Sequence, residues 1–262
     1  MPEFTIRVDL QGDIGVLEWS DQVDEATLTE AVSLAADDAI LGHEVRRVEA
    51  HVMASDLIAR RALHRAGFRR EGIRRQAMAI EDGFADVVMY ARLASDQVYG
   101  PGGFSAVMDS VLPTKRVIAH VLFTDEAGRV LLLETTYKSD YELPGGVVEP
   151  RESPRDGAVR EVAEEIGMLV QLGTPTLVDW MPPHLGWSDA IEFIYDAGVL
   201  DQDAAELLHL DPTEIVAAHW LAPDEVADHV SELSARRIRA ILDARTAPRL
   251  GPMTIFTQDG RV

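Results

Sequence analysis

One stretch of the chain, residues 145–168, constrains the fold and the chemistry more than any other. It opens with a pair of glycines and continues into a segment with helical spacing. Ser153 can cap that helix, Pro154 suits its first position, and Asp156 stands where a capping box needs an acceptor. Gly167 is placed to end it. The sequence therefore predicts a glycine turn followed by a short helix.

Three glutamates of this helix share one face, because Glu161, Glu164 and Glu165 stand at i, i+3 and i+4. Carboxylates crowded on one face repel each other unless a cation lies among them. Hard oxygen ligands of this kind suit Mg²⁺ or Mn²⁺. The alternative is a solvated acidic helix face, which is what acidic runs usually are. A separate apolar stripe would pack on a core: Ala158, Val159, Val162, Ala163 and Ile166.

Fixed spacings across the whole stretch favour the metal site over the solvated face. They resemble the Nudix box, in which a glycine is followed at set intervals by Glu, Arg-Glu, an apolar residue, Glu-Glu, Gly and an apolar residue. A match at so many fixed positions is specific. The resemblance covers residues 116–245 and implies an α/β/α sandwich with a mixed sheet. The matching positions are Gly146, Glu152, Arg160, Glu161, Val162, Glu164, Glu165, Gly167 and Met168.

The Nudix resemblance implies hydrolysis of a nucleoside diphosphate linked to another group, with divalent metal bridging the pyrophosphate. On that basis Glu161 and Glu165 are the expected main metal ligands. Glu164 is expected as a third ligand or as the base for the bridging water, so that Glu164 and Glu165 are the expected catalytic residues. The Gly145 carbonyl is the expected main-chain ligand.

The other box residues are expected to support this site. Arg160 and Glu152 are predicted to form an internal ion pair that fixes the loop around the helix, next to Gly146. A carboxylate outside the box often completes such a site in the family. The sequence does not choose among Asp189, Glu192, Glu206 and Glu214.

Substrate contacts are expected from loops near the box. Lys138 could hold a phosphate, although an exposed charge is the other reading. Trp180 and Trp220 are expected in the core, because aromatic residues at strand positions usually pack there. The residues expected to contact substrate are Tyr137, Lys138, Trp187 and Asp189, with His184 as a further stacking candidate.

The first part of the chain alternates strand-like and helix-like segments. This order resembles the later part of the GNAT acetyltransferase fold over residues 5–95. The segments that resemble the family most specifically are 47–52, 62–72 and 86–91. The expected elements are two strands within 4–19, a helix at 25–41, a strand at 45–52, a helix at 57–66 and two strands within 73–93.

This first domain departs from the family where coenzyme A would bind. The pyrophosphate cradle should fall on residues 23–26, which hold no glycine. Asp24 and Glu25 would repel phosphates there. We therefore expect a partial, non-catalytic α/β domain at 1–95, kept for assembly or for covering the neighbouring active site.

A segment rich in glycine and proline, 96–115, is the expected linker. The domain after it, 116–262, should contain a hairpin of strands 117–123 and 129–134 ahead of the box. Strands near 170–180, 190–199 and 215–220 should follow, then a helix at 224–245 and an edge strand at 254–257.

The amino-acid composition limits the classes of partner that the protein is expected to bind. A formal charge of −21 weighs against nucleic acid or an anionic membrane, but not against a small anionic nucleotide bound through metal. There is no secretory signal, no long apolar run and no cysteine, which fits a cytoplasmic protein. An incomplete first sheet would leave an open edge, which favours a homodimer.

Two other functions stay open at this point. The chain could sense a nucleotide without cutting it, or be an acetyltransferase with a regulatory Nudix domain. The identity of the nucleotide substrate is not encoded in any motif of the sequence.

Overall fold

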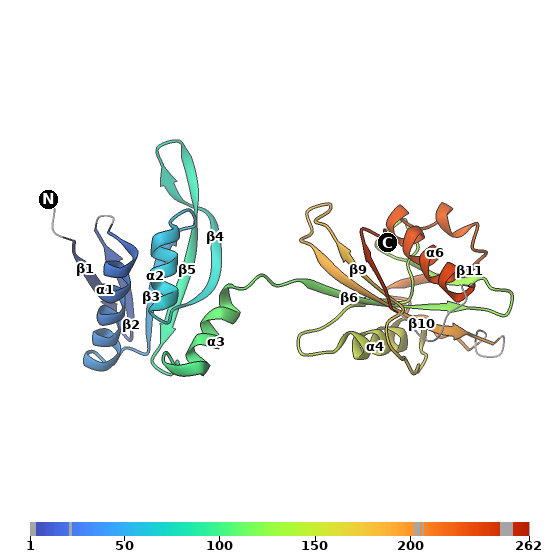
Figure 1. Ribbon diagram of the computed structural model, residues 1–262, viewed down its shortest axis with the longest axis horizontal. Coiled ribbons are helices and arrows are strands. Elements are labelled where there is room, and N and C mark those ends of the chain that lie inside the picture. The colour runs from blue at the N-terminus through green and yellow to red at the C-terminus, as the bar shows by residue number, and fades with distance from the viewer. Residues whose placement is uncertain (1–3, 21–22, 202–204, 206, 247–253, 262) are drawn as a thin grey trace. The chain divides into compact units, whose positions relative to one another are not determined.

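The computed structural model describes residues 4–20, 23–201, 205, 207–246 and 254–261. The chain divides into two compact units, Met1–Pro113 and Thr114–Val262 (Figure 1). Each unit has its own sheet and its own buried apolar core.

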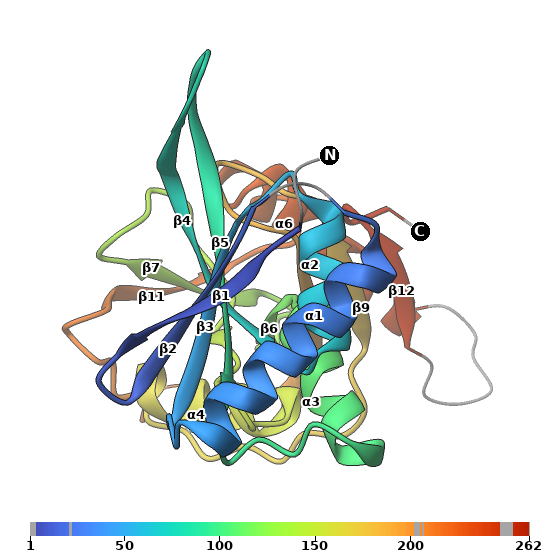
Figure 2. The same cartoon turned by 90° about the vertical axis from the view of Figure 1, so that its left-hand side faces the viewer.

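The first unit is a five-stranded sheet in the order β1-β2-β3-β5-β4. Strands β2 and β3 run parallel, and the other neighbours run antiparallel. Helices α1 and α2 lie on the same face of the sheet (Figure 1, Figure 2). The elements are β1 (Ile6–Gln11), β2 (Ile14–Trp19), α1 (Glu25–Asp37), the short π-helix η1 (Asp38–Gly42), β3 (Arg47–Met53), α2 (Leu57–Arg65), β4 (Arg69–Ile80), β5 (Gly83–Leu93) and α3 (Gly100–Val111).

Alternation along β3 explains how this sheet buries one face. Val48, Ala50 and Val52 are buried while their neighbours in sequence are more exposed, as a half-buried strand requires. They join a core with Val32 of α1 and Leu63 of α2. The expected strands and helices of this part are present, although β4 begins at Arg69 instead of Ile73.

Helix α3 lies within the range 96–115 that the sequence predicts as a linker. It belongs to the first unit, since the Ser110 hydroxyl accepts from the backbone N–H of Arg70 on β4 at 3.2 Å. A side chain at Gly103 would have its Cβ 2.5 Å from the backbone of Val98, so glycine lets this helix fold back closely. The division between units falls after Pro113, and the domain limits themselves stay a prediction.

The second unit is a seven-stranded mixed sheet in the order β11-β7-β6-β10-β9-β12, with β8 paired to β6. Strand β6 runs parallel to β10, and β9 runs parallel to β12. The elements are β6 (Arg116–Thr124), β7 (Val130–Thr135), β8 (Gly145–Val147), α4 (Pro154–Ile166), β9 (Leu177–Met181), β10 (Ala190–Val199), β11 (Ile215–Leu221), the 3₁₀ turn η2 (Val226–Asp228), α6 (Glu232–Thr246) and β12 (Ile255–Gln258).

Two cores lie on opposite faces of this sheet. Val121 and Phe123 of β6 pack in the cluster that contains Val162 of α4. Leu122, between them in sequence, packs in the cluster that contains Ile241 of α6. Because successive side chains of a strand point to opposite faces, one apolar strand serves both helices. The expected α/β/α sandwich with a mixed sheet is confirmed.

The terminal helix is shorter than the sequence predicts. A helix was expected from Asp224, but α6 begins at Glu232. The Ser231 hydroxyl accepts from the backbone N–H of Ser234 at 3.1 Å, which marks the start. Between Asp224 and Ser231 the chain forms only the short 3₁₀ helix η2, and the His229 carbonyl accepts from the N–H of Tyr141 at 2.8 Å instead of from a following turn of helix.

Strand boundaries elsewhere agree with expectation, with one shift. The strand expected near 170–180 begins at Leu177. The edge strand expected at 254–257 is β12, paired to β9. Within the described part of the chain, no helix is long and apolar enough to cross a membrane.

Candidate active site

The glycine turn of the box lies directly against β6. Strand β8 pairs with it so that Gly145 faces His120. Gly145 has φ 135°, and a Cβ there would lie 2.2 Å from the Ala119 carbonyl oxygen. A Cβ on Gly146 would lie 3.0 Å from the Glu161 carboxylate. The glycines therefore allow the strand to approach both β6 and the carboxylates of α4.

The box helix has the ends that the sequence predicts. The Ser153 hydroxyl accepts from the N–H of Asp156 at 3.2 Å, and Pro154 stands in the first turn. Gly167 ends the helix in the left-handed conformation, with φ 71°. In place of a full capping box, the carboxylate of Asp156 accepts from the Ser153 hydroxyl at 2.7 Å.

Packing of α4 on the sheet separates the three glutamates that were expected on one face. Val162 and Ile166 are fully buried, and this fixes the rotation of the helix. Glu165 is then only 5% exposed, whereas the side chain of Glu164 is 59% exposed and that of Glu161 is 16% exposed. The three carboxylates therefore differ in depth, from Glu165 in the interior to Glu164 at the surface.

Arg160 holds the box together through its whole guanidinium. Its Nε and Nη2 bond the two oxygens of Glu152 at 2.9 and 3.0 Å, so the expected ion pair is present. Its Nη1 bonds Glu161 and Glu164, each at 2.9 Å. A bidentate pair of this kind is geometrically specific. The hydrogen bonds from Arg160 hold the pKa of Glu152 below its usual range.

Glu165 is bonded to the glycine turn. Its Oε2 accepts from the backbone N–H of Gly145 at 2.7 Å. Burial raises the pKa of Glu165 to about 7, against the opposing effects of this hydrogen bond and of His120. Burial also raises the pKa of Glu161, although Arg160 opposes it. Each carboxylate lacks the solvation that would stabilise its charge.

The donor set fits a hard divalent cation. Two desolvated carboxylates lie beside a turn whose backbone approaches them closely, and a cation between them would offset the cost of their burial. As they stand, the described side chains include no group of three or more acids or histidines close enough to hold an ion. Arg160 and Gly145 occupy oxygens of Glu161 and Glu165 instead.

The four carboxylates considered outside the box differ in their surroundings. Burial is the main cause of the raised pKa of Glu161 and Glu165, and the charge of Glu214 adds to it in both, so Glu214 lies near the box. The backbone carbonyl of Glu214 also accepts from Thr136 at 2.8 Å. Asp189 is paired with Lys115, and Glu206 lies outside the described residues.

Glu192 belongs to a buried ionic network that the sequence did not reveal. Its Oε1 lies 3.0 Å from Nδ1 of His120, and its Oε2 accepts from Arg237. Arg237 also bonds Asp179, through Nε at 2.8 Å, and Asp179 Oδ1 accepts from the hydroxyl of Thr257 at 2.6 Å. The network therefore links α6 and the last strand to β6 beneath the glycine turn.

Charges within the network stabilise one another. Burial disfavours a charged imidazole, yet Glu192 raises the pKa of His120 overall. Burial likewise disfavours the carboxylate, but His120 and Arg237 lower the pKa of Glu192. One sequence signal could have found the network. Arg237 stands four residues before Ile241, on the apolar side of its helix, where an arginine needs a buried partner.

Tyr137 lies close to the box carboxylates. Burial, followed by the charges of Glu142 and Glu165, raises the pKa of Tyr137 to about 12, while 61% of the residue is exposed. Lys138 lies 5.7 Å from the centre of its ring and is paired with Glu142. Lys138 is therefore a charge near the site that already forms an ion pair. Its partner Glu142 is a neighbour of the site that the sequence did not reveal.

The loop between β9 and β10 carries the other residues expected to contact substrate. Trp187 is 63% exposed, with the guanidinium of Arg116 at 4.7 Å from its ring. His184 and Trp187 form an isolated bridge within that loop. Asp189 accepts from the indole N–H of Trp180 at 3.3 Å. The partners of these side chains lie at the start of β6 and on β9.

The two tryptophans expected in the core differ. Trp220 packs against the cluster beneath α4, as predicted. Trp180 is 36% exposed, so its assignment to the core was wrong. On β9 the side chain before it, Asp179, is fully buried, and the alternation of the strand turns Trp180 outward.

Comparison with known proteins places the second unit in a family. Residues 114–242 match the family model of the NUDIX domain. A MutT-like protein of Streptomyces ambofaciens is 32% identical over 118 residues, which are 45% of this chain and 71% of the relative. A CMP-5'-(N-acetyl-N-hydroxy-3-aminopropyl)phosphonate hydrolase of Streptomyces rubellomurinus is 31% identical over 140 residues, 47% of this chain and 64% of that protein.

An acetyltransferase is among the solved structures with some similarity to this chain. The ribosomal-protein-S5-alanine acetyltransferase of Vibrio fischeri is 16% identical, with a TM-score of 0.34. The similarity covers 36% of this chain and 55% of that one.

Proposed function

The chain belongs to the Nudix hydrolase family, and on this basis we propose that it hydrolyses a pyrophosphate bond in a nucleoside diphosphate linked to another group. The reaction we propose depends on Mg²⁺ or Mn²⁺. One relative is named for hydrolysis of a CMP-linked phosphonate, which supports a nucleotide joined to a second group as substrate.

The observation that carries this proposal is the position of Glu165. Its carboxylate is buried, hydrogen-bonded to Gly145 and raised in pKa, with Glu161 nearby. Glu161, Glu165 and the Gly145 carbonyl would hold the ion. A bound ion would neutralise pyrophosphate oxygens and lower the pKa of a coordinated water.

The remaining residues have supporting roles in this proposal. Glu164 reaches solvent next to Glu161 and is a third ligand or the base that takes the proton of the attacking water. Glu214 is the proposed carboxylate outside the box, since its charge acts on both Glu161 and Glu165. Arg160 and Glu152 hold the loop ahead of α4 in place.

Substrate recognition is proposed for the surface around Tyr137. This ring is exposed and close to the box carboxylates, so it can contact a base or ribose while the pyrophosphate lies over the glutamates. Lys138 can turn from Glu142 to a phosphate, because both side chains are partly exposed. Trp187 and Asp189 are proposed as a second group of substrate contacts.

The first unit is proposed to be a partial GNAT-like domain that transfers no acetyl group. Its strand order and its parallel β2–β3 pair support the resemblance. The carboxylate of Asp24 accepts from the first N–H groups of α1, which leaves them unavailable to a pyrophosphate.

A substrate panel tests the proposal. Nucleoside diphosphate sugars, dinucleotides and nucleoside triphosphates are incubated with the full chain in Mg²⁺, in Mn²⁺ and in EDTA, and products are resolved by phosphorus NMR. We expect cleavage at a pyrophosphate bond that stops in EDTA. Tight binding of an intact nucleotide without product would instead favour a sensor, and coenzyme A binding by calorimetry would favour an acetyltransferase.

A further inference from the structure

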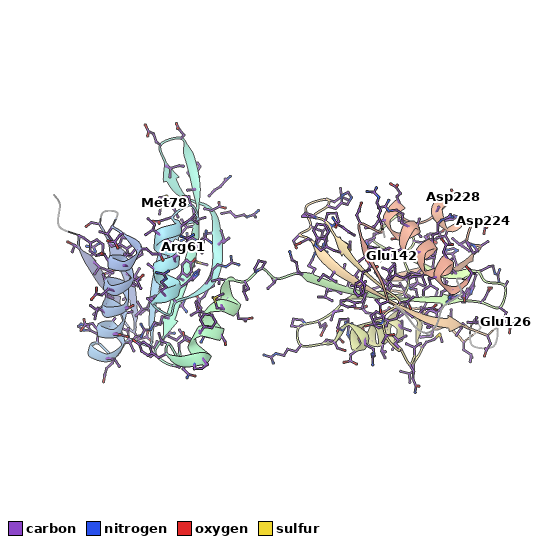
Figure 3. All side chains as sticks on the ribbon, in the orientation of Figure 1. Arg61, Met78, Glu126, Glu142, Asp224 and Asp228 are labelled. Atoms are coloured by element: carbon purple, nitrogen blue, oxygen red, sulfur yellow. The ribbon has the colours of Figure 1, made fainter. Side chains whose placement is uncertain are left out.

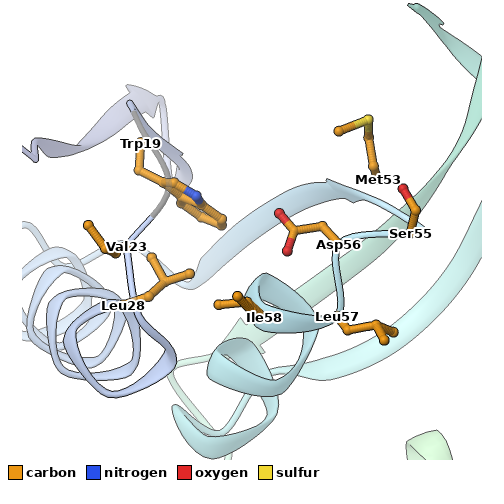
Figure 4. A pocket seen from close by; sticks show the side chains of 8 residues that line it. All are labelled: Trp19, Val23, Leu28, Met53, Ser55, Asp56, Leu57 and Ile58. Atoms are coloured by element: carbon orange, nitrogen blue, oxygen red, sulfur yellow. The ribbon is translucent and has the colours of Figure 1, made fainter.

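A cavity of about 340 Å³ opens in the first unit. Strands β2 and β3 pair in parallel only as far as Leu17 and Ala50. Beyond that point the cavity lies between the end of β2, the start of α1 and the turn that leads into α2 (Figure 4). Its apolar wall consists of Trp19, Val23, Leu28, Met53, Leu57 and Ile58.

One carboxylate lies within this apolar wall. Of the described residues that line the cavity, Asp56 is the charged one. Its side chain extends from the start of α2 toward Trp19, above Ile58 (Figure 4). One oxygen, Oδ1, accepts from the backbone N–H of Ala59 at 2.9 Å and so caps α2. The cap fixes the carboxylate in place at the edge of the apolar surface.

The cavity is poorly suited to an anion. Phosphates bind at helix N-termini through unsatisfied N–H groups. Here the N-terminus of α1 is capped by Asp24, which accepts from Ala26 and Thr27 at 3.0 and 3.1 Å. Asp56 caps α2 in the same way. Both carboxylates would also repel a phosphate or an acid.

The arginines near the cavity already have partners within the first unit. Nη1 of Arg60 bonds the Ala54 carbonyl at 2.8 Å. Arg65 pairs with Glu25 at 2.8 Å, and Arg61 lies 3.8 Å from the same carboxylate. These contacts hold the guanidinium groups outside the cavity wall, where Asp56 supplies the charge.

We propose that this cavity binds a small organic ammonium compound with an apolar body. The ammonium lies between the Asp56 carboxylate and the face of Trp19, and the body packs on Leu28 and Ile58. An ammonium gains from both the opposite charge and the indole ring. The apolar part gains from leaving water. This site is independent of the proposed hydrolase reaction.

Three probes with one alkyl chain and different charge test the proposal on the full-length protein. Hexylammonium, hexanol and hexanoate are titrated separately, and binding is followed by amide NMR shifts of the first unit. Because charge pairing and cation–π contact add to a common apolar term, hexylammonium should bind about tenfold more tightly than hexanol. Hexanoate should bind more weakly than hexanol.

Two variants isolate the carboxylate. Asp56→Asn should abolish the preference for hexylammonium over hexanol while keeping the helix cap, since asparagine caps as well as aspartate. Asp82→Asn removes the same charge at the exposed turn between β4 and β5 and should leave the preference unchanged. Equal binding of the three probes, tighter binding of hexanoate, no binding of any probe, or an unchanged preference in Asp56→Asn would each overturn the proposal.

Discussion

The backbone N–H of Gly145 donates to Oε2 of Glu165 across 2.7 Å, so the glycine turn and the buried glutamate of α4 are joined directly. The turn is itself paired to β6, and α4 is packed on the same sheet. The position of this carboxylate therefore depends on close backbone approach at Gly145. It does not depend on the helix alone.

Substituting Gly145 tests that dependence. Gly145→Ala places a Cβ 2.2 Å from the Ala119 carbonyl, so β8 must move away from β6. We expect turnover to fall at least about 100-fold, because misplacement by about 1 Å can cost that much. Gly128→Ala is the matched control. Its φ of 77° is also positive, but no atom lies within 4 Å of the new Cβ. Equal losses in the two variants would contradict the argument.

Glu165 predicts a pH dependence of stability in the metal-free protein. Its folded pKa of about 7 lies above the ordinary value of 4.5. Well below pH 4.5 both states are protonated and the group has no effect on stability. As pH rises toward 7 the unfolded state loses its proton first, so stability falls. The loss is on the order of 2–3 kcal/mol by pH 8.

Urea unfolding in EDTA at pH 5 and pH 8 measures this loss. In Glu165→Gln the unfolding free energy should not show this decrease between pH 5 and pH 8. The variant should therefore be more stable than the wild type at pH 8. Mg²⁺ should restore wild-type stability at pH 8, because it binds only the folded state. The same pH dependence of the unfolding free energy in the two proteins would contradict the raised pKa of Glu165.

The Glu152–Arg160 pair should behave as one unit. Arg160→Lys loses the two parallel hydrogen bonds to Glu152, and Glu152→Gln weakens them from the other side. We expect each change to lower kcat about tenfold through a looser loop, and the double variant to be little worse than either alone. Contacting residues commonly show coupling of about 0.5–3 kcal/mol. Additive losses in a double-mutant cycle would show that the two act separately.

The buried network predicts a stability difference between two neighbouring arginines. Arg237→Leu leaves the buried Asp179 without its cation and Glu192 with His120 alone, which should cost about 3–5 kcal/mol of unfolding free energy. Arg239→Leu changes an exposed residue of the same helix and should stay within about 0.5 kcal/mol of wild type. Chemical unfolding of both variants measures this difference in unfolding free energy. A small effect at Arg237 would mean that the network contributes little.

A homodimer stays our prediction for the assembly. The hairpin of β4 and β5 projects beyond the remaining strands of the first unit (Figure 2). It carries exposed apolar side chains, Met78 among them (Figure 3), and Phe84 is 67% exposed. Light scattering should give about twice the chain mass of 28.8 kDa, and Phe84→Asp should lower it. A monomer for the unaltered chain would defeat this prediction.

Local signals in the sequence were sufficient for the box. The cap at Ser153 and the stop at Gly167 directly flank the helix whose ends they define, so residue type and spacing predicted both. The burial of Glu165 and the exposure of Glu164 could not be read this way. Neighbouring positions on one helix face differ in depth only once the helix is packed on a sheet.

Contacts between distant segments account for what the sequence did not predict. His120 and Glu192 are separated by 72 residues, and Arg237 and Glu192 by 45. Only the parallel pairing of β6 with β10, and the placement of α6 over the sheet, bring these charges together. The outward turn of Trp180 follows likewise from the burial of Asp179 by a distant arginine.

The most direct test of the central claim is turnover of the best substrate by Glu165→Gln in saturating Mg²⁺. Glu126→Gln, on the exposed turn between β6 and β7 (Figure 3), is the matched control. Metal-dependent pyrophosphate hydrolysis carried by the box predicts that Glu165→Gln lowers kcat by about 100-fold or more, while Glu126→Gln keeps wild-type kcat. Wild-type kcat in Glu165→Gln would contradict the account.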